Sequence, residues 1–267
     1  MIDSRTRARA SLVGCSVGDA LGDQLANPVA VRERRLPTAP WWWTDDTEMA
    51  CSIFHVLDVC GQVEQGFLAD SFVRHYDQDR GYGNGVVVLM REVAKGGDLR
   101  TLAAASFDGT GSWGNGSAMR VAPLGAWFAG DGDRAAEEAA RSATVTHTHP
   151  EAVAGAVATA VAAAGGDLVE VLRLTPPSKV RDGIETAMAM AVGTGRLVSA
   201  PDTVPLALWV AARHADDFEE AIWTAAAEAE DVDTVCAIVG GIVAARVGLD
   251  GIPPAWRQAT EPLPSWV

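Results

Sequence analysis

The sequence predicts an all-α fold, formed by a single compact domain of about ten helices. Apolar residues recur every three to four positions along most of the chain, which is the period of an amphipathic helix. After Gly132 the chain is rich in alanine, the strongest helix former. No segment alternates apolar and polar residues over five or more positions. We therefore expect residues 1–267 to form one multi-helix domain, with its core between about residues 10 and 260.

The individual helices follow from this periodicity. In the first half of the chain, apolar residues at helical spacing predict helices over 12–25, 49–60, 67–76 and 86–93. In the second half they predict helices over 134–142, 150–164, 179–192, 204–214, 219–229 and 234–247. Pro150 and Pro205 are expected in first turns, where a missing N–H costs nothing. Glycines are expected at helix C-termini at four places, namely Gly61, Gly165–Gly166, Gly193 and Gly248. The segments 27–44 and 106–120 are the least regular, and loops of that length in a helical domain usually carry function.

Composition excludes several classes of protein. The net charge is -14, so non-specific nucleic-acid binding and anchoring on anionic lipid are both disfavoured. Four cysteines are scattered without a CxxC pair, which argues against a disulfide scaffold and against a structural zinc site. No apolar run is long enough to cross a bilayer, and we expect a reduced, cytoplasmic protein that does not bind membranes.

Two clusters of acidic residues stand at helix starts. Thr44, Asp45 and Asp46 precede the helix at 49–60, and the run 230–234 (Glu-Asp-Val-Asp-Thr) precedes the helix at 234–247. Either cluster alone is also typical of a helix N-terminal cap. Oxygen ligands without His or Cys suit a hard cation such as Mg²⁺, and four Asp carboxylates exceed what one Mg²⁺ normally recruits. If the clusters meet in space, a site for two Mg²⁺ ions is plausible.

Two glycine-rich loops and a histidine pair complete the set of candidates. The segment 109–116 contains a formal GxGxxG, but no strand precedes it, which weakens a Rossmann interpretation. That loop and the segment 80–85 could bring backbone N–H groups close to a phosphate, or could simply be tight turns. His147 and His149 precede a helix and lack zinc-ligand spacing, so capping or packing also explains them.

Taken in order, these motifs resemble those of the ADP-ribosylglycohydrolase family, of the dinitrogenase-reductase-activating type. The resemblance rests on Gly14-x3-Gly18-Asp-Ala-Leu-Gly22, Trp43-Thr-Asp-Asp-Thr47, Gly114-Asn-Gly-x-Ala-Met-Arg120, Thr146-His147 and Asp231-x-Asp233-Thr234. Within the family, Asp79-Arg-Gly-Tyr-Gly-x-Gly85 followed by Gly111-Ser-Trp-Gly-Asn-Gly116 is most similar to the ADP-ribosylserine hydrolase branch.

The resemblance implies an all-α enzyme with two Mg²⁺ ions at the bottom of a cleft for ADP-ribose. The matching positions imply as metal ligands Thr44, Asp45, Asp46, Asp231, Asp233 and Thr234. They imply as contacts to ADP-ribose Gly81, Tyr82, Gly83, Ser112, Trp113, Gly114, Asn115 and His147. The reaction would be hydrolysis at ribose C1″ of an ADP-ribosylated protein side chain or a related conjugate, through an oxocarbenium-like transition state. Among the carboxylates, we assign catalytic roles to Asp45, Asp46, Asp233 and Glu230.

The chain departs from the family pattern at two places. A glutamate that commonly follows the Gly18–Gly22 segment, and is implicated in catalysis, is Ala26 here. The usual Gly-Gly before the last Asp pair is Ala229-Glu230, and Val232 replaces Thr between the two aspartates. One interpretation is an enzyme in which Glu230 or Asp23 supplies the missing carboxylate. Another is a regulatory protein that binds ADP-ribose without turnover, and a third is a metal-dependent hydrolase acting on an unrelated small molecule. Because all six metal-ligand positions are retained, we favour the enzyme.

Overall fold

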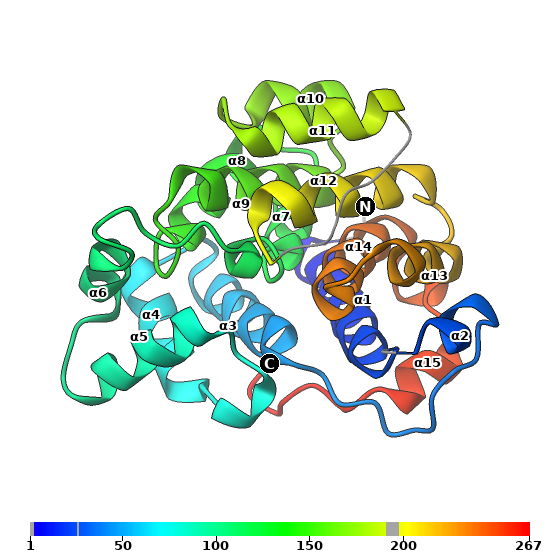
Figure 1. The fold of residues 1–267 in the computed structure, drawn as a ribbon, viewed down its shortest axis with the longest axis horizontal. Coiled ribbons are helices and arrows are strands. Elements are labelled where there is room, and N and C mark those ends of the chain that lie inside the picture. The colour runs from blue at the N-terminus through cyan, green and yellow to red at the C-terminus, as the bar shows by residue number, and fades with distance from the viewer. Residues whose placement is uncertain (1–2, 26, 191–197) are drawn as a thin grey trace.

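The computed structural model describes residues 3–25, 27–190 and 198–267. Within these residues it contains fifteen α-helices, three short 3₁₀-helices and no strand, which confirms the predicted all-α fold (Figure 1). The expected count of about ten helices is too low. The expectations for Ala26 and for the C-cap at Gly193 lie outside the described residues.

The N-terminal part contains the predicted helices and several short ones. Its elements are α1 (Ser4–Gln24), α2 (Pro28–Arg32), α3 (Asp45–Cys60), α4 (Gln65–His75), η1 (Gln78–Arg80), α5 (Asn84–Ala94) and α6 (Leu99–Ala105). The first helix starts earlier than predicted because Asp3 caps it, its side chain accepting the N–H of Thr6 at 2.8 Å. As expected, α3 ends at Gly61, which adopts a left-handed conformation with φ 72°.

The remaining helices follow the predicted order with small shifts at their ends. They are η2 (Asn115–Ser117), α7 (Ala122–Trp127), α8 (Gly132–Ala143), α9 (Pro150–Ala163), α10 (Leu168–Leu174), α11 (Lys179–Met190), α12 (Ala200–Arg213), α13 (Phe218–Glu228), α14 (Val232–Val247), η3 (Leu249–Gly251) and α15 (Pro254–Ala259). Pro150 starts α9 as predicted. The first-turn prediction for Pro205 is wrong: α12 begins at Ala200, Pro201 occupies the first turn, and Pro205 lies inside the helix.

Helices α1 and α14 form the centre of the molecule, with α3 beside them (Figure 1). The two central helices approach closely because glycines face the opposite backbone. A Cβ added at Gly22 would lie 2.7 Å from Cα of Asp233 and 2.8 Å from the carbonyl oxygen of Val232. Gly14 and Gly18 approach α14 more closely still. The Gly-x3-Gly-x3-Gly spacing of α1 therefore determines how near α1 lies to the start of α14.

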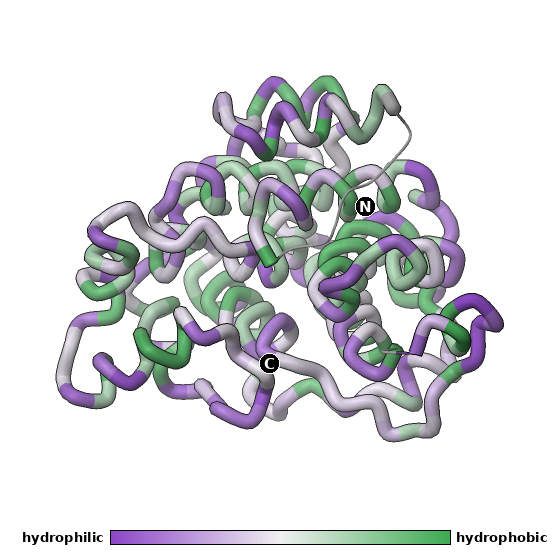
Figure 2. Tube along the Cα trace, in the orientation of Figure 1, coloured by the Kyte–Doolittle hydropathy of each residue, from purple (hydrophilic) through white to green (hydrophobic). Residues whose placement is uncertain are grey.

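One continuous hydrophobic cluster extends from Val17 to Trp256 and includes residues of both halves of the chain. Figure 2 shows hydrophobic residues concentrated on the central helices, with hydrophilic residues more frequent on the outer helices and loops. Within the described residues, no helix is long and apolar enough to span a membrane. All four cysteines are free thiols, as the scattered spacing predicted.

Candidate active site

The start of α3 is anchored to α1 by Asp19. This carboxylate is fully buried and accepts the backbone N–H of Thr44 at 2.9 Å and that of Thr47 at 3.1 Å. It also accepts the hydroxyls of Thr44 at 2.8 Å and Thr47 at 2.5 Å. Asp19 thus acts as an N-terminal cap supplied by another helix, in addition to Thr44, whose own hydroxyl accepts the N–H of Asp46 at 3.4 Å. The result is a fixed position for the two aspartates that follow.

Asp45 and Asp46 from the first turn of α3 meet Asp231 and Asp233 from the start of α14 at one cavity. The cavity has a volume of about 300 Å³, and Thr234 also lines it. The two acidic clusters, which are separated by about 185 residues in the sequence, therefore come together as the sequence analysis required. No lysine or arginine lines the cavity among the described residues.

Burial and mutual repulsion disfavour the charged forms of these acids. Burial, followed by the charges of Asp19 and Asp233, raises the pKa of Asp45 to about 8. Burial and then Asp233 raise the pKa of Asp231 to about 7. Burial and the neighbouring aspartates also hold the pKa of Asp46 well above its usual range. These raised pKa values indicate that the ionised carboxylates lack a nearby positive charge that would stabilise them.

The side chains fit a hard cation in their chemistry. Oδ1 of Asp46 is buried and has no hydrogen-bond partner in the described structure. Its other oxygen, Oδ2, lies 3.2 Å from the hydroxyl of Thr44. In the part of the chain that is described, no three His, Cys, Asp or Glu side chains are arranged to hold one metal ion together. Mg²⁺ often takes one or two carboxylates and keeps several waters, so pairs of aspartates with threonine oxygens satisfy its requirements.

The glycine-rich loops form another part of the cavity wall. Gly81 and Gly83 line it from the segment before α5. Ser112 and Gly114 line it from the segment before η2, and Asn115 from the start of η2. Nδ2 of Asn115 donates to Oδ2 of Asp231 at 2.6 Å, and this bond connects the loop to the acidic cluster. Of the eight predicted ligand contacts, six line the cavity, including His147.

His147 is buried against the glycine loop in its neutral form. A Cβ at Gly116 would lie 2.8 Å from Cε1 of the ring, so only glycine leaves room for the imidazole. Burial and the charge of Arg120 lower the pKa of His147 to about 3. Its Nδ1 lies 2.7 Å from the hydroxyl of Thr146. His149, in contrast, is the N-cap of α9 and accepts the N–H of Glu151 at 3.1 Å, as the capping interpretation predicted.

Four predicted site residues do not line this cavity. One is Thr44, whose hydroxyl is bonded to Asp19 and lies 3.2 Å from Oδ2 of Asp46. Tyr82 is buried, and its hydroxyl donates to Glu48 at 2.6 Å, so it holds the loop in place from behind. Trp113 is half exposed, next to His149 and Lys179. Glu230 is exposed, although its neighbour Asp231 lines the cavity. Glu230 lies outside the cavity although it is next to Asp231 in the sequence, because the chain turns at the start of α14.

The structure also adds residues that the sequence analysis did not assign to the site. Asp19 positions Thr44, and its only signal was its place in the Gly18–Gly22 motif. Asn84 and Met119, which lie within two of the quoted motifs but had no assigned role, also line the cavity, as does Phe107.

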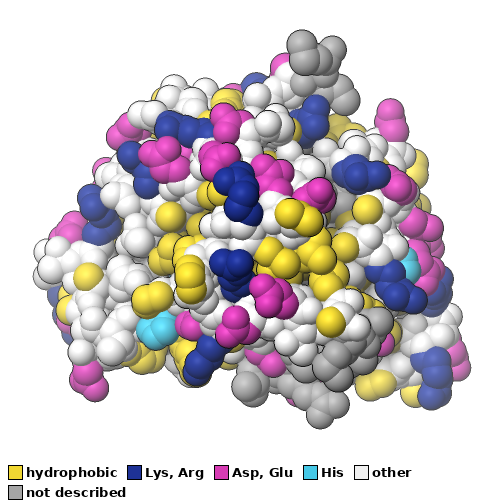
Figure 3. Space-filling model, turned by 90° about the horizontal axis from the view of Figure 1, so that it is seen from above, with side chains coloured by type: hydrophobic (Ala, Val, Ile, Leu, Met, Phe, Trp, Pro, Cys, Tyr) yellow, Lys and Arg dark blue, Asp and Glu magenta, His cyan; other side chains and the backbone are white. Residues whose placement is uncertain are grey.

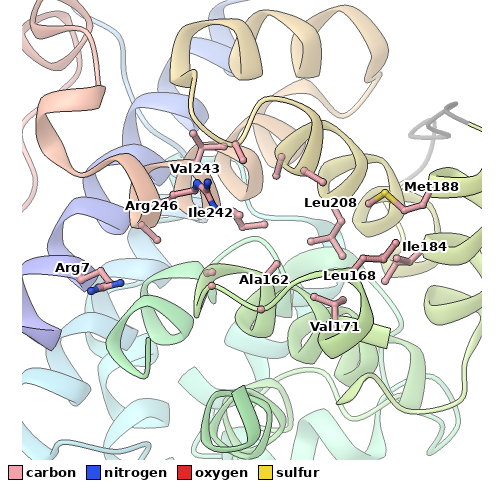
Figure 4. A pocket seen from close by; sticks show the side chains of 17 residues that line it. Arg7, Ala162, Leu168, Val171, Ile184, Met188, Leu208, Ile242, Val243 and Arg246 are labelled. Carbon is pink, nitrogen blue, oxygen red and sulfur yellow. The ribbon is translucent and has the colours of Figure 1, made fainter. Parts of the chain in front are cut away.

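A second cavity, of about 320 Å³, lies among α9, α11, α12 and α14 and has a different character. The face in Figure 3 exposes hydrophobic side chains near its middle. Figure 4 shows apolar side chains such as Leu208 and Ile184 turned into the cavity, with Arg7 and Arg246 near its edge. It contains none of the predicted site residues, and its lining lacks carboxylates among the described residues.

Comparison with known proteins shows the family to which the chain belongs. A model of the ADP-ribosylglycohydrolase family matches residues 1–267. The chain is 25% identical to human ADP-ribosylhydrolase ARH3, over 97% of this chain and 90% of that protein. It is 27% identical to ADP-ribosylarginine hydrolase Tri1 of Pseudomonas putida (strain GB-1), over 94% of this chain and 73% of that protein. A solved structure described as an ADP-ribosylglycohydrolase-related protein complex matches with a TM-score of 0.73 at 29% identity, covering 97% of this chain and 93% of that one.

Proposed function

The chain is an enzyme of the ADP-ribosylglycohydrolase family, and from this premise we propose that it hydrolyses a bond at ribose C1″ of ADP-ribose. The other atom of this bond is an oxygen or nitrogen of a modified protein side chain or of a related conjugate. Water adds to C1″, the acceptor atom leaves with a proton, and free ADP-ribose results. The reaction is a glycoside hydrolysis, in which positive charge develops on the ribose ring in the transition state.

One observation carries the proposal: two pairs of aspartates from distant segments face a single cavity without a basic partner in its lining. A buried group of like charges is costly to maintain, so a fold that keeps it needs a compensating ligand. The developing positive charge of an oxocarbenium-like ribose is one such partner, and a bound divalent cation is another.

We propose that two Mg²⁺ ions complete the site. Asp45, Asp46 and Thr44 would hold them from α3, and Asp231, Asp233 and Thr234 from α14. When bound, Mg²⁺ ions orient ribose hydroxyls, lower the pKa of a bound water and offset developing negative charge.

The remaining wall of the cavity suits the nucleotide portion of ADP-ribose. Gly81, Gly83 and Gly114 leave their backbone open to close approach by a phosphate. Asn115 holds Asp231, and the neutral ring of His147 also lines the cavity, where it offers a polar contact without adding charge. Asp45, Asp46 and Asp233 remain the proposed catalytic carboxylates.

A panel of substrates tests the proposal. ADP-ribose attached to serine and to arginine in peptides, O-acetyl-ADP-ribose and poly(ADP-ribose) are each incubated with the protein in Mg²⁺ and in EDTA, and released ADP-ribose is measured. We expect hydrolysis of at least one linkage, and we expect EDTA to abolish it. The isosteric variant Asp233→Asn serves as a control for contaminating hydrolases, because it changes one proposed ligand.

The panel also decides between turnover and simple binding. Tight ADP-ribose binding in calorimetry with no release from any linkage would establish the regulatory alternative that Ala26 raises. Absence of both binding and release would reject an ADP-ribose function altogether. Hydrolysis by the wild-type protein that persists in EDTA but is lost in Asp233→Asn would reject the metal assignment alone.

A further inference from the structure

A third hollow, of about 350 Å³, opens beside the acidic cluster, on the side of Thr44. We call it the acceptor groove; its lining is Asp23, Trp42, Trp43, Thr44, Asp79, Arg80, Gly81 and Glu261. It shares Gly81 with the cavity described above, and its Thr44 directly precedes Asp45. Burial and then the carboxylate of Asp233 raise the pKa of Asp23, which places Asp23 near the cluster as well. The acceptor groove therefore adjoins the cavity next to the acidic cluster.

This position fits the part of a substrate that leaves. If ADP-ribose fills the glycine-walled cavity with C1″ at the aspartates, the bond to the acceptor points away from that cavity. The acceptor groove is the adjoining hollow, next to Asp45 on the side of Thr44. A modified polypeptide chain would thus cross it.

Trp42 gives the acceptor groove an exposed aromatic surface. Its neighbours Trp41 and Trp43 are 2% and 5% exposed, whereas Trp42 is 54% exposed. Trp41 is fixed by backbone hydrogen bonds to the end of α15 and the segment after it. Its N–H donates to Ala259 at 2.8 Å, and its carbonyl accepts from Glu261 at 2.8 Å. These hydrogen bonds fix the backbone next to Trp42 and so keep its side chain exposed. An indole face of this kind binds cations and covers apolar stems of long side chains.

Trp43 contributes a second feature. It is nearly buried, it lines the acceptor groove, and its indole N–H has no acceptor within the described structure. A buried donor without a partner is costly to maintain.

The charge of the acceptor groove is negative in spite of Arg80. The guanidinium of Arg80 is bound by both carboxylate oxygens of Glu261, at 2.7 and 2.9 Å, and lies 3.4 Å over the ring of Trp43. Asp23 and Asp79 form no ion pair within the described ranges. The net charge presented to a substrate is thus that of two carboxylates next to an exposed indole.

We propose that the acceptor groove binds the polypeptide that flanks the modified residue and selects segments carrying lysine or arginine. The proposal rests on the proposed function and assigns Trp42 and Asp79 as specificity-determining residues for the acceptor side. Cations of the substrate would lie against the indole of Trp42 and near the carboxylate of Asp79.

The test uses two peptides modified on the same residue type and flanked by lysines or by glutamates, with the corresponding ADP-ribosylated free amino acid as a third substrate. We expect wild-type kcat/KM to be about five- to tenfold higher for the lysine peptide, and Trp42→Ala and Asp79→Lys to bring this ratio towards one. Trp42→Phe should retain most of the preference. Asp70→Lys, the same charge change at an exposed position of α4 outside the acceptor groove, should leave the ratio unchanged.

Hydrolysis of the free amino acid substrate should stay within about twofold in all four variants, because it lacks flanking chain. Equal kcat/KM for both peptides in the wild type, or equal losses on peptides and free amino acid, would overturn the acceptor groove while leaving the proposed function intact. Absence of hydrolysis of all three substrates would instead overturn the proposed function and this proposal with it.

Discussion

The variant Gly22→Ala tests whether the spacing of α1 and α14 determines the geometry of the acidic cluster. A Cβ at this position would lie 2.7 Å from Cα of Asp233, whereas ordinary contact begins near 3.4 Å. The neighbouring atoms are backbone and cannot rotate away, so α14 must move by about 0.7 Å relative to α1. That movement shifts Asp233 itself, while Asp45 remains fixed through Thr44 and Asp19.

Stability and function should respond differently to this substitution. Overpacking costs about 1–3 kcal/mol, and the gain from replacing glycine by alanine in a helix offsets about 0.5–1 kcal/mol of it. The melting temperature should therefore fall by only about 2–8 °C. Activity should fall by about tenfold to a hundredfold, because displacements approaching 1 Å at a reacting centre have effects of that order.

Thermal unfolding with and without Mg²⁺, combined with kcat/KM on the best substrate of the panel, measures both effects. Gly66→Ala is the matched control, since Gly66 lies in α4 and a Cβ there would meet no atom within 4 Å. We expect the control to keep the activity and the Mg²⁺-induced shift in melting temperature, and Gly22→Ala to lose most of both. If Gly22→Ala matched the control in both measurements, helix spacing would not determine the site.

Three further outcomes follow from the same geometry. Asp45→Asn and Asp233→Asn should each lower activity by orders of magnitude and reduce the Mg²⁺-induced rise in melting temperature, and an undiminished rise in both variants would contradict the ligand assignment. In EDTA, the free energy of unfolding from urea titration should fall as the pH rises from 4 through about 8. The reason is that the folded-state pKa of Asp45 is raised to about 8 and that of Asp231 to about 7. Their contribution to stability is therefore complete below pH 3.8 and lost above those values. Saturating Mg²⁺ should remove this fall. The lowered pKa of His147, about 3, acts in the opposite direction, since its contribution to stability is present above pH 6.5 and is lost towards pH 3. If the free energy of unfolding in EDTA instead rose steadily up to about pH 8, the charged aspartates would not be destabilised by burial. Glu230→Gln should change kcat by less than about twofold because the side chain is exposed outside the cavity, and a loss above tenfold would restore it to the mechanism.

The long helices could be predicted from sequence, whereas the short ones could not. A helix such as α9 or α14 repeats its apolar spacing over several turns, so its period is visible without the fold. Helices of five to seven residues, such as α2, α6 and α15, complete too few turns to show a period and depend on tertiary contacts. Pro205 was assigned to a first turn because proline is typical there, but Ser199 and Pro201 mark the actual start of α12.

The site could be predicted in its chemistry more fully than in its geometry. Paired acids before helices indicate a cation wherever they occur, so Asp45 and Asp233 could be named from the sequence. The roles of Asp19 and Tyr82 depend on which helix packs against which. Asp19 reaches the N–H groups of Thr44 and Thr47 only because α1 crosses the start of α3, and no local pattern encodes that crossing.

The placement of the acids at two helix starts does not by itself make the cluster stable. An aspartate whose pKa rises from 3.8 to about 7, as for Asp231, has its charged form disfavoured by about 4 kcal/mol. A helix N-terminus returns only about 0.3–1 kcal/mol to each nearby carboxylate. Hydrogen bonds from Asn115 and Thr234 lower the pKa of Asp231, yet burial and Asp233 still hold it at about 7. At neutral pH the cluster therefore opposes folding unless protons or cations neutralise it. Natural selection would retain such a cost only where the charge is used, and this is why the stability of the protein and its proposed catalysis should depend on the same ion.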